Sequence, residues 1–286
     1  MPPLLDAHCH LQDAAFAPHH PQLVADFASV GLARAVVNGT SETDWPDVTA
    51  LCRQLSTVAL QLLPSYGLHP WDVGNRTPDW QRHLLARLDA DPAAALGEIG
   101  LDRWILDSAR PDDPRLAGLR RAPLEEQIEV FAWQLTLAAE RNLPASVHCL
   151  EAFGPLFDTL RATPRPARGF LLHAYNGSTQ LAKGFADLGA YFSFNGAFLD
   201  PRKERLRHLY AMLPADRLLV ETDAPAMRLP ASRETFPPLA APDGSAANHP
   251  ANLAVTYAAL AALRGVTVES LAAQVAENFT RLFGPR

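Results

Sequence analysis

Short apolar runs alternate with longer helical patterns along the whole chain. The apolar runs end at a polar residue, a glycine or a proline, which is typical of strands buried in a parallel sheet. We therefore predict eight strands, over residues 4–10, Ala33–Val37, Leu60–Tyr66, Ala93–Leu96, Ala145–His148, Gly169–His173, Tyr191–Phe194 and Leu218–Thr222.

A helical pattern follows each predicted strand. In the longest pattern, over Leu124–Arg141, apolar residues recur at spacings of three and four, as on the buried face of a helix. Eight strands that alternate with helices predict an α/β fold, and specifically a TIM (β/α)8 barrel. No linker divides the chain, so we expect a single domain over residues 1–286. Other helices are predicted over Gln22–Val30, Pro78–Leu88, Pro201–Met212, Pro250–Leu263 and Val268–Leu282.

Two long segments break this alternation. Arg103–Pro123 is rich in proline, aspartate and arginine, and Leu229–Pro250 is rich in proline. Neither shows a clear period, so we predict loops on the active-site face, where long insertions shape the substrate pocket.

Composition indicates an ordinary globular protein, with 48% hydrophobic and 20% charged residues among 286. No run approaches the roughly 18 apolar residues that a membrane span needs, and no signal region begins the chain. We therefore expect no membrane association and a cytoplasmic location. The net charge of −6 gives no general attraction to nucleic acid, so any phosphate recognition would have to be local.

The three cysteines, Cys9, Cys52 and Cys149, are odd in number and show no C-x-x-C spacing. This pattern argues against a disulfide framework and against a thiolate zinc site. We expect all three to be structural.

Histidines and carboxylates gather at the predicted strand ends. His8 and His10 alternate along the first strand, so both side chains face the same way, with Asp6 one step deeper. Parallel barrels keep their chemistry at the carboxyl ends of their strands. The other residues at such ends are Glu98, His148, His173 and Asp223.

Imidazole and carboxylate ligands of this kind suit one or two divalent metal ions, with Glu98 as the candidate bridge. Two ions polarise a substrate oxygen and lower the pKa of a bound water toward ~7. Asp223 can bind one ion and also take the proton from that water as general base. The alternative is that these histidines are structural residues of the core. That alternative must explain why residues of the ligand type stand at the ends of five separate strands.

Two further residues have competing interpretations. His69 either contacts substrate or braces its Gly-Pro turn. Glu221 lies two residues before Asp223 and is either a support for the centre or a core carboxylate paired with an arginine.

These motifs together resemble the TatD-type metal-dependent deoxyribonucleases, over nearly the whole chain. The matching segments are residues 6–11, Gly67–Pro70, Gly97–Asp102, His148, His173, Glu221–Pro225, Asn278 and Leu282–Gly284. The resemblance implies an amidohydrolase-like TIM barrel. It also implies one metal on His8, His10 and Asp223, a second metal on His148 and His173, and Glu98 between them.

The resemblance is incomplete around the pocket. The family usually has an arginine two residues after the histidine of the fifth strand, where this chain has Leu150. It commonly has Cys-Phe-Thr-Gly after the next histidine, where this chain has Ala174–Gly177, and its loop after the fourth strand is shorter. Arg103, Arg120 or Arg121 could replace the lost cation, with Arg103 as the candidate for substrate binding, or all three could be solvated loop charges.

We therefore expect a binuclear metal-dependent hydrolase, a phosphodiesterase or deoxyribonuclease of the 3′-5′ exonuclease kind, acting on DNA or another nucleotide-containing substrate. One alternative is amide or ester hydrolysis at the same centre. Another is a metal-binding barrel that works as a subunit of a larger assembly with a protein partner. Zinc, manganese, magnesium and nickel are all compatible with these ligands, and the oligomeric state is open.

Overall fold

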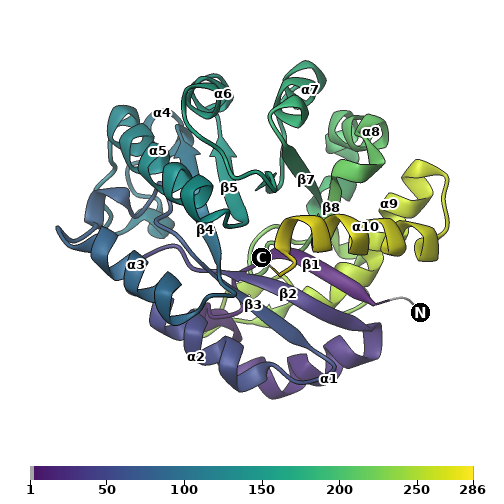
Figure 1. Ribbon diagram of the computed structural model, residues 1–286. Coiled ribbons are helices and arrows are strands. Elements are labelled where there is room, and N and C mark those ends of the chain that lie inside the picture. The colour runs from purple at the N-terminus through teal and green to yellow at the C-terminus, as the bar shows by residue number, and fades with distance from the viewer. Residues whose placement is uncertain (1–2, 286) are drawn as a thin grey trace.

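Eight parallel strands pair in sequence order around a barrel, and the helices surround it (Figure 1). The computed structural model describes residues 3–285. The predicted (β/α)8 barrel is confirmed. The strands are β1 (Leu4–Cys9), β2 (Leu32–Asn38), β3 (Gln61–Tyr66), β4 (Ala95–Asp102), β5 (Ala145–Leu150), β6 (Phe170–Leu172), β7 (Ala190–Asn195) and β8 (Leu218–Glu221).

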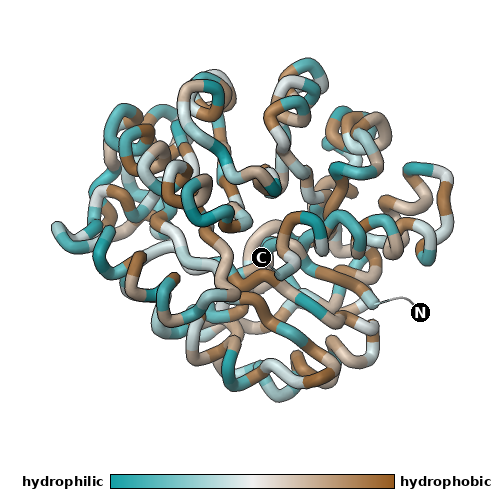
Figure 2. Tube along the Cα trace, in the orientation of Figure 1, coloured by the Kyte–Doolittle hydropathy of each residue, from teal (hydrophilic) through white to brown (hydrophobic). Residues whose placement is uncertain are grey.

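The helices bury one side against the barrel and leave the other side polar, and hydrophobic positions follow the strands in Figure 2. In the described chain no single helix is long and apolar enough to cross a membrane. The helices are α1 (His20–Val30), α2 (Trp45–Leu55), α3 (Trp80–Ala90), α4 (Trp104–Asp107), α5 (Leu124–Arg141), α6 (Phe153–Ala162), α7 (Thr179–Asp187), α8 (Glu204–Met212), α9 (Leu253–Arg264) and α10 (Val268–Phe283).

Strand β4 is longer than its apolar run predicts, because it continues past Leu96 to Asp102. Its two glycines allow the close packing of this continuation. A Cβ atom on Gly100, whose φ is +145°, would lie 2.0 Å from the carbonyl oxygen of His148 on β5. A Cβ atom on Gly97 would lie 2.8 Å from Cβ of Ser146. Glycine thus lets the strand carry Glu98 into the barrel.

Both segments predicted as loops contain short elements. Arg103–Pro123 holds α4 and a 3-10 turn over Pro114–Leu116. Leu229–Pro250 holds a two-stranded antiparallel ribbon, β9 (Leu239–Ala240) with β10 (Ala246–Ala247). The sequence analysis did not predict these elements, because elements this short leave no detectable period in a proline-rich sequence.

Asp6 ties β1 to the segment after β8, where the barrel closes. Its Oδ1 accepts from the backbone N–H of Thr222 at 3.1 Å and of His8 at 3.2 Å. Its Oδ2 accepts from the hydroxyl of Thr222 at 2.6 Å. Two backbone hydrogen bonds lie beside it, from Asp223 to His8 at 2.9 Å and from His10 to Ala224 at 2.8 Å.

Replacing Asp6 by alanine is expected to lower the free energy of unfolding by about 2–4 kcal/mol, because buried donors on Thr222 lose their acceptor. Urea denaturation of wild type and variant measures the difference. The matched control is Asp79→Ala, at an exposed carboxylate that pairs with the exposed Arg82. Equal stability of the two variants would show that the closure does not depend on Asp6.

The three cysteines are free, as the sequence predicts. Cys9 and Cys52 are buried, and the thiol of Cys9 contacts the backbone oxygen of Val36 at 3.3 Å. Burial raises the pKa of Cys52 to about 12, which keeps that thiol protonated at neutral pH.

Candidate metal centre

Six predicted ligands meet at the carboxyl ends of the barrel strands. Four of them are buried and two, His10 and His148, are half-buried. They come from β1, β4 and β5 and from the residues that follow β1, β6 and β8, so distant parts of the chain build one cluster. The cluster consists of His8, His10, Glu98, His148, His173 and Asp223, all of which belong to groups of side chains that could hold a metal ion, and one of these groups also contains His69.

One group of ligand atoms surrounds Oε2 of Glu98. Nε2 of His8 lies 3.2 Å from this oxygen, and Nε2 of His10 lies 3.3 Å from it. Oδ1 of Asp223 lies 3.7 Å from Nε2 of His8 and 3.4 Å from Nε2 of His10. A tetrahedral zinc ion with bonds of about 2.0–2.1 Å would separate its ligand atoms by about 3.3–3.4 Å. These four side chains therefore fit a metal ion.

Hydrogen bonds orient the imidazoles of this first group. Nδ1 of His10 lies 2.8 Å from the backbone oxygen of Asn38. A carbonyl only accepts, so Nδ1 carries the proton and Nε2 keeps its lone pair for a metal. Nδ1 of His8 lies 2.8 Å from the hydroxyl of Ser146 on β5, and this hydrogen bond also holds the orientation of the ring.

A second group surrounds the other oxygen of Glu98. Nε2 of His173 lies 2.8 Å from Oε1, and Nδ1 of His148 lies 3.1 Å from it. These two nitrogens are 3.2 Å apart. Glu98 thus presents each of its oxygens to a different set of imidazoles, as a bridging carboxylate would.

The charges of the cluster stabilise one another. Burial opposes ionisation of Glu98, but the surrounding imidazoles, led by His173, hold its pKa well below the usual range. Burial lowers the pKa of His8, which favours its neutral form. Burial has the same tendency at His10 and His173, but nearby carboxylates outweigh it and raise both pKa values. A metal must displace these protons, so binding weakens as the pH falls.

His69 lies beside the cluster but has a different tautomer. Its Nδ1 accepts from the backbone N–H of Trp71 at 3.2 Å. In the neutral ring the proton is therefore on Nε2, which lies 3.4 Å from Oε1 of Glu98. His69 braces its turn, as one interpretation of the sequence expected, and directs a donor toward Glu98.

Asp102 belongs to the site, although the sequence analysis did not select it. Its Oδ2 accepts from Nε2 of His148 at 3.0 Å and from the indole N–H of Trp71 at 2.6 Å. Burial opposes ionisation, but the bond to His148 lowers the pKa of Asp102. Asp102 lies four residues after Glu98 on β4, in the same short segment that drew attention to Glu98, so the sequence carried a signal for it.

We expect Asp102→Asn to weaken metal binding by about 10- to 100-fold, because His148 loses a charged acceptor that orients its ring. Competition with a metal-binding dye measures the change. The matched control, Asp107→Asn, alters an exposed carboxylate in the same segment. An Asp102 variant with the affinity of this control would contradict the orienting role.

Glu221 lies under the second group rather than against an arginine. It is fully buried and accepts from the hydroxyl of Ser193 and from Nδ2 of Asn195 at 3.2 Å. Its Oε1 lies 3.9 Å from Nδ1 of His173. Among residues 3–285 no arginine forms an ion pair with Glu221, which argues against the core-pair interpretation.

The three arginines considered for substrate binding are engaged elsewhere. Arg103 is exposed and pairs with Asp107 at 2.6 Å. Arg120 pairs with Glu126 at 2.7 Å, and Arg121 donates to the backbone oxygens of Ile105 and Arg110. The structure therefore does not bring Arg103 into the cluster, and a role for it in substrate binding stays a prediction.

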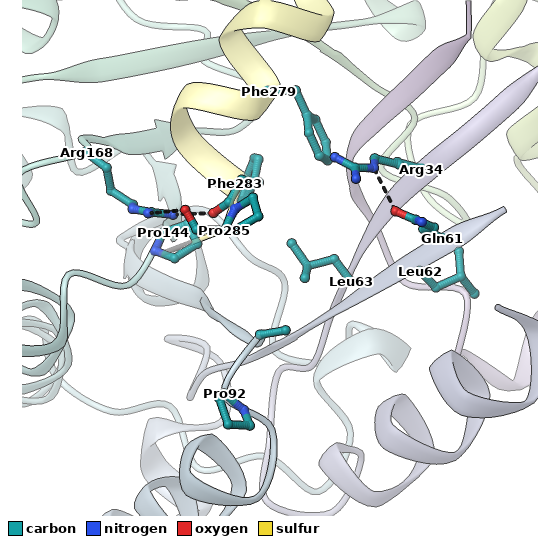
Figure 3. Close-up of a pocket in the computed structure, with 12 residues that line it drawn as sticks. Arg34, Gln61, Leu62, Leu63, Pro92, Pro144, Arg168, Phe279, Phe283 and Pro285 are labelled. Atoms are coloured by element: carbon teal, nitrogen blue, oxygen red, sulfur yellow. Dashed lines mark hydrogen bonds between the residues drawn. The ribbon is translucent and has the colours of Figure 1, made fainter. Parts of the chain in front are cut away.

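A pocket of about 260 Å³ lies at the opposite end of the barrel (Figure 3). It is lined by the start of β2 and β3 and by Phe279 and Phe283 of α10. In its lining, Arg34 on β2 donates to Gln61 on the neighbouring strand β3 at 3.0 Å. Its lining contains neither histidine nor carboxylate, so the chemistry of the cluster has no counterpart there.

Known proteins match the chain along nearly its full length. The family model described as TatD related DNase matches residues 5–284. The chain belongs to this family. The "3'-5' ssDNA/RNA exonuclease TatD" of Erwinia amylovora is 29% identical over 282 residues, which cover 98% of this chain and 100% of that protein. The family match confirms the resemblance drawn from the motifs.

Two other relatives of the TatD family are similar in length and fold. The "Uncharacterized metal-dependent hydrolase YjjV" of Escherichia coli is 29% identical over 281 residues, covering 98% of this chain and 97% of that protein. The crystal structure of YjjV superposes with a TM-score of 0.81 at 28% identity, over 99% of this chain and 98% of that one. A TatD family hydrolase from Entamoeba histolytica, at 16% identity and the same TM-score of 0.81, shows the shared fold.

Proposed function

We propose that this chain is a binuclear metal-dependent phosphodiesterase that removes nucleotides from the 3′ end of single-stranded DNA or RNA. Relatives named as 3′-5′ ssDNA/RNA exonucleases support this substrate class, because they match the chain from end to end. The observation that carries the proposal is the position of the Glu98 carboxylate, whose two oxygens each face a separate set of imidazoles.

Each side of Glu98 would hold one divalent ion. His8, His10 and Asp223 would bind the first, His148 and His173 the second, and Glu98 both. When bound, such ions polarise a phosphate oxygen and lower the pKa of water toward ~7. The mixture of imidazole and carboxylate ligands suits zinc, manganese or nickel better than magnesium.

The protein side chains then act on the proton and the substrate. Asp223 is the general base: burial opposes its ionisation, but the bond from His10 lowers its pKa, so it is a carboxylate at neutral pH. It can therefore take the proton of the attacking water. His69 directs its Nε2–H toward the side of Glu98 that faces the second group, where it can donate to a substrate oxygen.

The test uses single-stranded oligonucleotides labelled at the 5′ end, with manganese, zinc, nickel or magnesium added to the metal-stripped chain. We expect a metal-dependent ladder that shortens one nucleotide at a time, because each cut removes one 3′ nucleotide. His148→Ala and His173→Ala should each lose this activity, and the exposed Glu277→Gln should keep it.

Two outcomes would contradict the proposal. Hydrolysis of amides or carboxylic esters without cleavage of DNA or RNA would favour the other reaction open to this centre. Activity only in the presence of a second protein would favour the role of a subunit in an assembly.

A cytoplasmic location stays a prediction.

A further inference from the structure

Three flat side chains lie together beside the metal centre. The rings of Trp71 and Trp104 are stacked, with centroids 6.0 Å apart and planes at 24°. The guanidinium carbon of Arg115 lies 4.8 Å from the ring centroid of Trp104 and 5.9 Å from that of Trp71. We call Trp71, Trp104 and Arg115 the stacking cluster.

The stacking cluster is joined to the metal centre by two contacts. The indole N–H of Trp71 donates to Oδ2 of Asp102, the oxygen that also accepts from Nε2 of His148. The ring of Trp71 also meets the ring of His69 edge-on, at 5.7 Å. Asp102 therefore links Trp71 to His148, a proposed metal ligand, through hydrogen bonds.

The stacking cluster is partly open to solvent. Trp71 and Trp104 are half-buried, and the side chain of Arg115 is 60% exposed. Aromatic surface beside a polar cluster offers contact area for a flat ligand. Trp71 lies in the turn after β3, Trp104 on α4 and Arg115 in the 3-10 turn Pro114–Leu116, on the same end of the barrel as the ligands.

Asp113 holds Arg115 in place. Nε of Arg115 donates to one carboxylate oxygen of Asp113 at 3.0 Å, and Nη2 donates to the other at 2.7 Å. This bond raises the pKa of Arg115, and the negative charge of Asp102 adds to the effect, so Arg115 is within electrostatic reach of the centre. A guanidinium fixed in this way keeps its plane over the rings.

We propose that the stacking cluster binds a base of single-stranded nucleic acid next to the phosphate that is cut; this inference rests on the proposed function. Tryptophan faces stack on any base, and an arginine above them adds attraction to base and backbone. Arg115 is placed to do this because its guanidinium lies over both rings while Asp113 holds it.

The test compares kcat/KM on two single-stranded oligonucleotides of equal length. One carries thymine throughout, and the other has abasic residues at its last three 3′ positions. The wild-type chain should prefer the first by roughly tenfold to hundredfold, because only that substrate can stack. Trp104→Leu should bring the two values to within about twofold by losing activity on the first alone, and Trp104→Phe should restore most of the preference.

The matched control is Trp133→Leu, because Trp133 is another half-buried tryptophan that packs on a second one, Trp80, at 4.8 Å. It should keep the preference of the wild type. The proposed base-binding role would be overturned if Trp104→Leu lowered kcat/KM equally on both oligonucleotides, or if the wild type did not prefer the thymine oligonucleotide. Either result would leave the proposed nuclease activity intact. No cleavage of either oligonucleotide by the wild type would overturn both proposals.

Discussion

Replacing Glu98 by glutamine is expected to reduce bound metal from two equivalents to one or fewer and to lower kcat by about 10³-fold or more. The amide removes the negative charge that both sets of imidazoles face. It also turns an N–H₂ group toward one of the two sets, where a metal would need an acceptor. Elemental analysis after dialysis measures the metal, and turnover of a single-stranded oligonucleotide measures the activity.

The control for this variant is Glu277→Gln, an identical chemical change on the exposed face of α10. It should bind metal and turn over substrate as the wild type does. A Glu98 variant that retained two equivalents of metal and near-normal kcat would show that Glu98 does not bridge the centre.

Replacing Asp223 by asparagine is expected to lower kcat by about 10²- to 10⁴-fold at saturating metal, the contribution usual for a general base. Asparagine keeps the shape and an oxygen ligand, but it cannot accept the proton of the attacking water. Burial and the bond from His10 act on the pKa of Asp223 in opposite directions, and the lowered result leaves the carboxylate ready at neutral pH.

Saturating manganese separates this loss from a loss of metal affinity, because weaker binding is overcome by excess metal whereas a missing base is not. Asp216→Asn, at an exposed aspartate before β8, is the matched control. A kcat within about twofold of the wild type would remove Asp223 from the role of base and leave it as a ligand only.

The sequence predicts the barrel and the gathering of these side chains at one end of it, because both depend on local regularities. Apolar runs mark the strands, and a ligand at the end of a parallel strand has only one edge of the barrel to occupy. His8 and Glu98 are far apart in sequence, yet their strand-end positions bring them within 3.2 Å. Period-two alternation predicts that His8 and His10 face the same way.

The residues outside that regularity are harder to predict. Asp102 was overlooked because Glu98 was taken as the one carboxylate of the segment after Leu96, whereas β4 continues through that segment to Asp102. The stacking cluster depends on the path of Arg103–Pro123, where α4 and a single 3-10 turn bring Arg115 over Trp104. No local sequence pattern encodes such a contact between a short helix and a turn.

The central claim is that Glu98 joins two metal sites, and anomalous diffraction from crystals grown with manganese tests it most directly. The account predicts two peaks about 3.5–4 Å apart, one on each side of the Glu98 carboxylate. One peak should touch His8 and His10, and the other His148 and His173. A single peak, or peaks that do not contact Glu98, would contradict the account.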